Sequence, residues 1–214
     1  MIDRYHWRGG EECWVRTGIG HTHQIVIIEP LFEEKNRTRR LIAQIMRGLD
    51  AQGIGATLPD LPGTGESVTD IATVTIDDWR DAIGAVQAAI NPVITAAFRG
   101  GALLSGTGTV WHFAPESGAR IVRDLKRTQL ASASANLLYA GHELSDAFLA
   151  GLEVATIADP ARLRIVRLES DAGNADAKLP GTPLWRRAEP GDDPALAAAI
   201  IADLTQWVKQ CATC

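Results

Sequence analysis

Hydrophobic residues along the chain alternate between short β-branched runs and longer stretches with a helical period. The run at residues 23–29, HQIVIIE, is of the first kind, which is typical of a parallel strand buried on both faces. From Asn36 to about Gln52 the apolar residues recur on one face of a 3.6-residue period, which predicts an amphipathic helix. Gly53 follows at the position where helices commonly end.

The same alternation continues along the rest of the chain. It predicts strands at residues 12–16, 54–58, 92–98, 109–113 and 163–168, and helices at 76–90, 116–133, 145–155 and 194–209, with a further helix beginning at 100–104. Thr75 and Asp78 have the spacing of a helix capping box, and residues 172–180 form a polar loop. Strands and helices that take turns predict an α/β fold, a doubly wound, mostly parallel sheet with helices on both faces.

Composition and charge narrow the class of protein. The 214 residues, 46% of them hydrophobic, are enough for one domain over residues 1–214. A formal net charge of −5 gives no basic face for nucleic acid or for an anionic membrane. No run of apolar residues approaches the ~18 of a membrane span, and the N-terminal residues lack the apolar core of a signal peptide. We therefore expect a cytoplasmic protein.

Cysteine usage agrees with this location. The chain has three cysteines, Cys13, Cys211 and Cys214, an odd number that gives no framework for a disulfide-rich secreted scaffold. Cys211 and Cys214 have C-x-x-C spacing, but a redox motif of this kind normally opens a helix near a strand. We interpret the pair as an incidental tail.

The loop after residue 98 carries the most informative motif, because ligands of open α/β sheets bind beyond the carboxyl ends of the strands. Residues 97–101, AFRGG, align with the Gly-x-Ser-x-Gly nucleophile elbow, a sharp turn between a strand and a helix. Ala97 and Gly101 supply the small residues that such a turn needs. Arg99 stands at the apex, where its protonated guanidinium cannot attack a carbonyl carbon. An ordinary βα turn with an exposed arginine is the alternative interpretation.

Several segments resemble a known family. Residues 60–67, DLPGTGES, resemble the Asp-x-x-Gly-x-Gly-x-Ser loop ahead of the elbow in α/β hydrolases. The chain is similar to the exosortase A system-associated hydrolases of the second type in residues 29–40, 60–67, 79–82, 99–104, 140–145 and 181–185. The resemblance implies an α/β-hydrolase fold, arginine at the elbow of other members, and a bacterial setting of exopolysaccharide production and protein sorting to the envelope. At this length we expect a reduced or absent cap domain, and residues 105–160 are the region that could form a lid.

The rest of a catalytic triad is incomplete in the sequence. Glu169 or Asp171 could fill the acid position after strand 163–168. The segment before the last helix, residues 181–193, contains no histidine, so base and nucleophile are both missing. His142 could reach the site from an accessory helix, although a surface or capping role is the simpler interpretation. Ser67 ends a Gly-x-Ser sequence on a loop with no strand directly before it, which favours a turn role.

Other kinds of site have weaker support. His21 and His23 would lie on one face of a strand, but no third ligand follows by spacing, so no metal site is predicted. Gly18-x-Gly20 and Gly106-x-Gly108 are too fragmentary for the Gly-x-Gly-x-x-Gly of a nucleotide binder. We expect no cofactor.

Charged residues near the elbow predict recognition chemistry instead of hydrolysis. Glu33 and Glu34 stand where an α/β hydrolase keeps its oxyanion loop, and carboxylates there would repel a developing oxyanion. A buried Arg99 needs a partner, so we predict an ion pair with Glu33 or Glu34, with Asn36 and Arg37 nearby. Alternatively, Arg99 binds a ligand carboxylate or phosphate with the Gly100 and Gly101 amides. The residues expected at a ligand are Arg99, Gly100, Gly101, Glu33, Glu34, Asn36 and Trp185.

These observations favour a non-catalytic binding or accessory protein with an α/β-hydrolase fold. Its partner would be a small acyl or anionic ligand, or a protein of the exosortase and polysaccharide system. The alternative is an active esterase or acyltransferase with an unorthodox site, using His142 or a serine outside the elbow.

Overall fold

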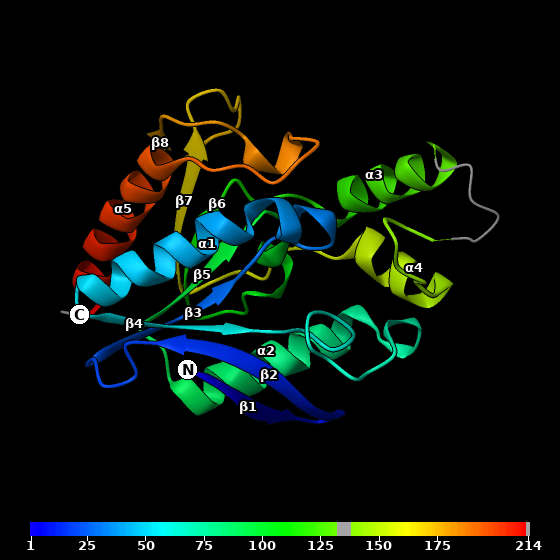
Figure 1. Cartoon of the computed structure of the whole chain (residues 1–214), viewed down its shortest axis with the longest axis horizontal. Coiled ribbons are helices and arrows are strands. Elements are labelled where there is room, and N and C mark those ends of the chain that lie inside the picture. The colour runs from blue at the N-terminus through cyan, green and yellow to red at the C-terminus, as the bar shows by residue number, and fades with distance from the viewer. Residues whose placement is uncertain (132–137, 213–214) are drawn as a thin grey trace.

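The computed structural model describes residues 1–131 and 138–212. Within them, one eight-stranded sheet has the order β1-β2-β4-β3-β5-β6-β7-β8 (Figure 1). The strands are β1 (Ile2–Trp7), β2 (Gly10–Thr17), β3 (His23–Ile28), β4 (Ile54–Pro59), β5 (Ile94–Phe98), β6 (Thr109–Phe113), β7 (Arg162–Leu168) and β8 (Ala177–Leu179). The pairs β1–β2 and β2–β4 are antiparallel, and all pairs from β4 to β8 are parallel. The predicted doubly wound, mostly parallel sheet is confirmed.

Helices cover both faces of this sheet (Figure 1). The helices are α1 (Glu33–Ala51), α2 (Ile76–Ile90), α3 (Gly118–Ala131), α4 (Asp146–Val154) and α5 (Pro194–Ala212), with short 3₁₀ turns η1 (Ile71–Thr73), η2 (Arg99–Leu104) and η3 (Leu184–Arg186). Helices α1 and α5 pack in one buried cluster with Ile25 and Ile27 of β3. Helices α2, α3 and α4 pack in the other cluster with Val26 and Ile28. Alternate residues of β3 therefore belong to opposite cores, which explains its uninterrupted apolar run.

Local signals fix the start of α2 and the end of α1. Thr75 and Asp78 form the reciprocal capping box at the start of α2. The hydrogen bonds from Thr75 lower the pKa of the Asp78 carboxyl. Gly53 follows α1 with a φ of +75°, the left-handed conformation that ends helices and favours glycine. These signals are local, so sequence alone could place them.

Four details of the fold differ from the prediction. Strands β1 and β8 were not expected, and β8 lies inside the predicted polar loop 172–180. Both are edge strands, and β1 buries only Tyr5 of its six residues, so neither shows a strong apolar period. Helix α1 begins at Glu33 and not at Asn36, because carboxylates in a first turn are favoured by the helix dipole. The helix expected after Gly100 is the short 3₁₀ turn η2.

Two further predictions concern the ends of elements and the cysteines. Residues 132–133, predicted as the end of a helix, and Cys214 lie outside the described residues. Cys13 and Cys211 are in no disulfide within the described part of the chain. No helix among residues 1–131 and 138–212 has the length and apolar character needed to cross a membrane.

Candidate functional site

The predicted elbow is present after β5. Strand β5 ends at Phe98, and Arg99, the first residue of η2, takes a φ of +53°. Few residues other than glycine adopt this left-handed conformation. A Cβ atom at Gly101 would lie 2.6 Å from the carbonyl oxygen of Glu29, so only glycine lets η2 approach β3 this closely. The backbone keeps the shape of a nucleophile elbow, with an arginine at its apex.

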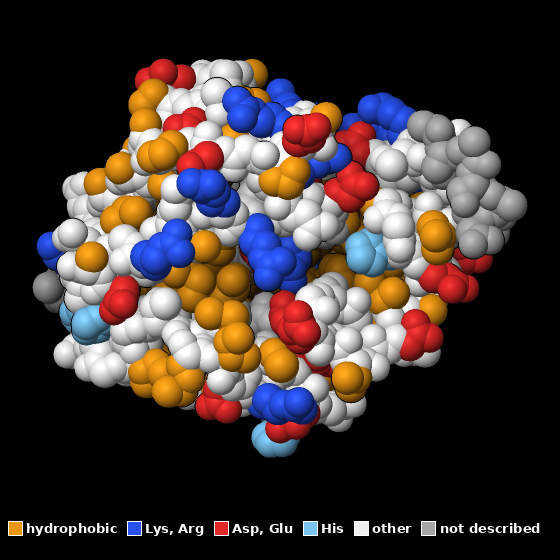
Figure 2. All heavy atoms as spheres, in the orientation of Figure 1, with side chains coloured by type: hydrophobic (Ala, Val, Ile, Leu, Met, Phe, Trp, Pro, Cys, Tyr) orange, Lys and Arg blue, Asp and Glu red, His pale blue; other side chains and the backbone are white. Residues whose placement is uncertain are grey.

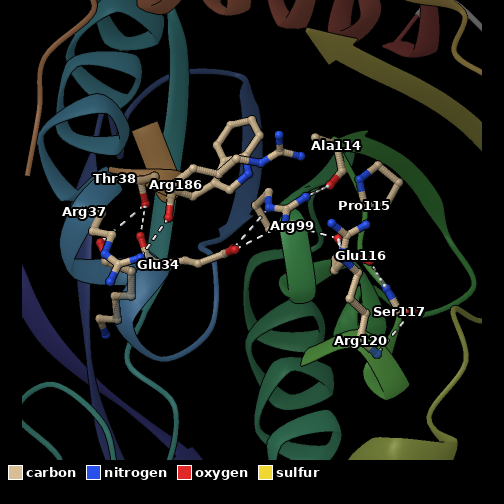
Figure 3. Close-up of polar contacts among 12 residues, drawn as sticks. Glu34, Arg37, Thr38, Arg99, Ala114, Pro115, Glu116, Ser117, Arg120 and Arg186 are labelled. Atoms are coloured by element: carbon tan, nitrogen blue, oxygen red, sulfur yellow. Dashed lines mark hydrogen bonds and ion pairs between the residues drawn. The ribbon is translucent and has the colours of Figure 1, made fainter. Parts of the chain in front are cut away.

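The Arg99 side chain is buried, and each of its three nitrogens donates to a neighbouring group (Figure 3). Its Nε and Nη2 donate to the two carboxylate oxygens of Glu34 at 3.1 and 3.2 Å. Nη2 also donates to Glu116 Oε2 at 3.2 Å, and Nη1 donates to the carbonyl oxygen of Ala114 at 2.9 Å. The guanidinium carbon lies 4.7 Å from the centre of the Trp185 ring, within cation–π range. The alternative of an exposed arginine on an ordinary turn is therefore wrong.

The ion pair uses only one of its two predicted partners. Glu34 binds Arg99, whereas Glu33 accepts from Arg37 one helical turn further along α1. Consecutive residues of a helix point about 100° apart, so one carboxylate faces the elbow and the other lies along the helix surface. Arg37 also donates Nη1 to the carbonyl oxygen of Trp185 at 3.0 Å, which joins α1 to η3.

Two carboxylates share the single guanidinium of Arg99. Burial raises the pKa of Glu34, and the nearby Glu116 raises it further, while Arg99 opposes both effects. Glu116 receives a second cation from Arg120, whose Nε lies 3.4 Å from Oε2. Four of the five N–H bonds of Arg99 are used within the protein. A ligand anion would have to displace a carboxylate in order to reach this guanidinium.

The elbow opens onto a pocket of about 350 Å³. Figure 2 shows a hollow in this face, with charged side chains around its edge and hydrophobic atoms inside. The lining residues come from the loop before α1, from α1, η2, the β6–α3 loop, α3 and η3, and from the loop before α4 at Ala140. Thr128 carries the only hydroxyl group among the described lining side chains, which include no serine, cysteine or histidine.

The residues predicted to bind a ligand separate into two groups. Gly100, Trp185, Glu33, Glu34 and Arg99 line the pocket. Gly101 instead packs against β3. Asn36 is exposed and does not line the pocket, because it lies two residues from Glu34, about 200° around α1. The expectation that Asn36 lies beside Arg99 is therefore wrong.

The other candidate catalytic residues do not meet at the elbow. His142 lies in the loop before α4, where its ring centre is 6.0 Å from that of Phe32 and burial lowers its pKa. Glu169 is exposed in the turn after β7. Asp171 Oδ1 lies 3.9 Å from Arg186 Nη2. Within residues 1–131 and 138–212, no histidine is hydrogen-bonded to Glu169 or Asp171, so neither forms the acid–base pair of a triad.

A serine–histidine pair that the sequence reasoning missed lies in the core. Ser105 Oγ is 2.9 Å from His112 Nε2, and both residues are about 1% exposed. Burial lowers the pKa of His112 to about 4. Ser105 donates its hydroxyl proton to the carbonyl oxygen of Ala102, so the imidazole donates from Nε2 and does not act as a base toward the serine. The imidazole of His112, among apolar neighbours in β6, was the available signal.

Residues 60–67, the loop that resembles the Asp-x-x-Gly-x-Gly-x-Ser segment, make contacts that hold neighbouring elements and the loop itself in place. Lys35 Nζ lies 2.7 Å from Glu29 and 3.0 Å from Asp60, so it joins α1 to the ends of β3 and β4. Ser67 Oγ accepts from the backbone N–H groups of Gly63 and Thr69. The predicted turn role of Ser67 agrees with these bonds.

The paired histidines do not come together with other metal ligands in the described part of the chain. His21 Nε2 lies 2.8 Å from Asp50 Oδ1. No group of three or more histidine, cysteine or acidic side chains that could hold a metal ion occurs among the described residues.

Comparisons with known proteins agree with the fold. No protein-family profile matches the chain, and no curated protein matches it in sequence. Among solved structures, mouse alpha/beta hydrolase domain-containing protein 10 is 12% identical, with a TM-score of 0.66 over 98% of this chain and 99% of that one. Est1E from Butyrivibrio proteoclasticus is 12% identical, with a TM-score of 0.63 over 100% and 99%. A thermophilic esterase from Thermogutta terrifontis is 11% identical, with a TM-score of 0.59 over 99% of each chain. The chain therefore has the α/β-hydrolase fold.

Proposed function

We propose that this protein binds a ligand in the pocket beside Arg99 and does not carry out serine-hydrolase catalysis at its elbow. The observation that supports this most directly is the arginine at the apex, where α/β-hydrolase enzymes carry their nucleophile. Its guanidinium is held by Glu34, Glu116 and the Ala114 carbonyl. A protonated guanidinium has no lone pair with which to attack an acyl carbon.

The surroundings of the elbow also disfavour acyl transfer. The tetrahedral intermediate of that reaction carries an oxyanion, which hydrogen-bond donors must stabilise. Here the side chains nearest the apex include the carboxylates of Glu34 and Glu116, which would repel the oxyanion. No histidine lines the described pocket, so no imidazole stands ready to move a proton.

The alternative is an esterase or acyltransferase that uses His142 or a serine outside the elbow. His142 does not line the pocket, and the serine that does contact a histidine, Ser105, is sealed in the core. The same experiment tests both possibilities.

The test combines fluorophosphonate labelling with turnover of a chain-length series of p-nitrophenyl esters and thioesters. Wild type, Arg99→Ala and His142→Ala are compared, with an active serine esterase as the positive control. We expect background turnover and no labelling in all three proteins. Labelling or turnover that His142→Ala abolishes would contradict the proposal and indicate a relocated nucleophile.

The resemblance to exosortase-associated hydrolases supports a cytoplasmic accessory role in an envelope polysaccharide or protein-sorting pathway. Deleting the gene in the source bacterium and measuring secreted exopolysaccharide tests this role. We expect a loss that the wild-type gene restores and that His142→Ala restores equally well, because a binding protein does not need that imidazole. Unchanged exopolysaccharide after deletion would argue against this pathway.

A further inference from the structure

The pocket lining combines apolar side chains with exposed arginines, and we infer from this that its ligand is a short anionic amphiphile with a carboxylate or phosphate head group. The apolar part would lie on the pocket floor, and the head group would lie between Arg127 of α3 and Arg186 of η3. This inference rests on the proposed binding function and names the class of ligand. Neither Arg127 nor Arg186 was singled out by the sequence.

Five apolar residues contribute to the pocket lining, and we call them the pocket floor. Leu31 and Phe32 come from the loop before α1, Ile121 and Leu125 from α3, and Trp185 from η3. A volume of about 350 Å³ is at the lower end of the ~300–1,000 Å³ of small-molecule sites. Such a floor suits a short hydrocarbon chain, because every methylene group that it covers leaves water.

The charged groups of the pocket are mostly neutralised within it. Glu34 and Glu116 share Arg99, and Arg120 also contacts Glu116. Glu33 accepts from Arg37. These tight pairs leave little attraction for a ligand of either charge deep in the pocket.

Arg186 and Arg127 at the pocket edge are the exceptions. Arg186 Nη2 lies 3.9 Å from Asp171 Oδ1, and its side chain is 59% exposed. Arg127 Nη1 lies 3.5 Å from Asp124 Oδ1, and its side chain is 74% exposed. Both distances exceed the ~2.7–2.9 Å of a good charge-assisted hydrogen bond. Each guanidinium can therefore turn toward a ligand anion at little cost, which the buried Arg99 cannot do.

The lining has one more basic than acidic side chain, and this favours an anion over a cation. The basic residues that line it are Arg37, Arg99, Arg120, Arg127 and Arg186, and the acidic ones are Glu33, Glu34, Glu116 and Asp124. The extra cation is Arg186, since its partner Asp171 lies outside the pocket. An arginine fork binds carboxylate or phosphate oxygens in pairs, so either head group fits this chemistry.

Calorimetric titration with four octyl compounds below their micelle concentrations tests the inference. The probes are octanoate, octyl phosphate, octanol and octylamine, added to wild type, Arg127→Gln, Arg186→Gln and Arg123→Gln. Arg123 is the matched control because it is exposed on α3 but does not line the pocket. We expect at least one anion to bind wild type about tenfold more tightly than octanol, and to lose about tenfold in Arg127→Gln and Arg186→Gln only. The tighter of the two anions identifies the head group.

Several results would overturn this ligand class. They are equal binding of octanol, tighter binding of octylamine, an equal loss in Arg123→Gln, or no binding of any probe to a folded protein. The fluorophosphonate assay does not depend on these probes. Failure of all four compounds with silent labelling would reject the anionic amphiphile but leave the proposal of a non-catalytic elbow, whereas labelling would reject that proposal itself.

Discussion

A serine hydrolase has its nucleophile, its histidine and its substrate pocket at one place, whereas this chain has a pocket at Arg99 and a serine–histidine pair at Ser105. The elbow at Arg99 has the sharp turn and an adjoining pocket of about 350 Å³ but no nucleophile. Ser105, six residues later, has a histidine 2.9 Å away but no route to solvent, since both residues are about 1% exposed. Catalysis needs a reactive group and a bound substrate at the same point. Access and reactive chemistry are separated in this molecule.

The Arg99 cluster and the Ser105–His112 pair also stabilise the fold in different ways. Around Arg99, opposite charges are largely removed from water, with the side chains of Arg99 and Glu116 9% and 14% exposed and that of Glu34 30% exposed, and they depend on one another. Around Ser105, two neutral polar groups satisfy each other in an apolar core. Removing one member should therefore cost more at the elbow than at the buried serine.

The largest expected effect is that of Arg99→Ala. This change leaves Glu34 and Glu116 without their shared cation, and breaking a buried pair in this way costs about 3–5 kcal/mol of unfolding free energy. Urea unfolding at neutral pH measures the loss, with the exposed Arg123→Ala as the control that should change little. The loss should shrink in acid, because protonated carboxyl groups need no cation. A loss below about 1 kcal/mol would mean that the elbow cluster does not hold the loops together.

The second effect is a pH dependence that comes from His112. Its folded-state pKa is about 4, below the ordinary value of 6.5, so the folded protein keeps the imidazole neutral where the unfolded chain protonates it. Above pH ~6.5 the imidazole is neutral in both states and the unfolding free energy does not depend on its titration. Between pH ~6.5 and 4 the unfolded chain gains a proton that the folded protein does not bind, so the unfolding free energy falls by about 3 kcal/mol.

The difference in stability between wild type and His112→Gln should carry this pH dependence, since the variant has no imidazole to titrate. His6→Gln serves as the control because the His6 side chain is 83% exposed. Guanidinium unfolding at pH 7, 5.5 and 4 gives the measurement. A difference that stays the same between pH 7 and pH 4 would show that water reaches the Ser105–His112 pair, so that this pair would not be separated from solvent.

The third prediction compares the stability losses of two substitutions at neighbouring residues of α1, Glu33 and Glu34. Glu34→Gln removes the paired contact with Arg99 and should cost about 2 kcal/mol. Glu33→Gln removes an i,i+4 pair at the surface and should cost less than ~0.5 kcal/mol. Thermal unfolding of the two variants side by side measures the ratio. Equal losses would mean that the charge of the first helical turn matters more than the contact with the elbow.

Sequence could predict the elements that local patterns define. The alternation of β-branched runs and helical periods gave the sheet and its two helical layers, and the small residues around Arg99 gave the elbow. The sequence narrows the ion-pair partner of Arg99 to Glu33 or Glu34 but no further, because both residues lie before the predicted helix, whose period would otherwise assign each of them a direction. The predicted start at Asn36 was three residues late.

The rest of the site depends on contacts between distant segments. Glu116 and the Ala114 carbonyl reach Arg99 from the loop after β6, and no spacing in the sequence indicates how that loop turns. His112 was available as a polar residue in an apolar strand, but its partner Ser105 lies beyond a turn whose path the sequence does not specify. The two arginines at the pocket edge belong to elements that only the fold brings together.

The smallest expected effect is that of Ser105→Ala. The change removes the hydroxyl that accepts from His112 Nε2, and a lost neutral hydrogen bond of this kind costs about 1 kcal/mol. Because the pair is sealed from solvent, the ester turnover and fluorophosphonate labelling of the variant should equal those of wild type. The exposed Ser170→Ala is the matched control for the loss of a hydroxyl. If Ser105→Ala lowers turnover while Ser170→Ala does not, the core must open often enough to admit an ester, and Ser105 would then be the nucleophile that the elbow lacks.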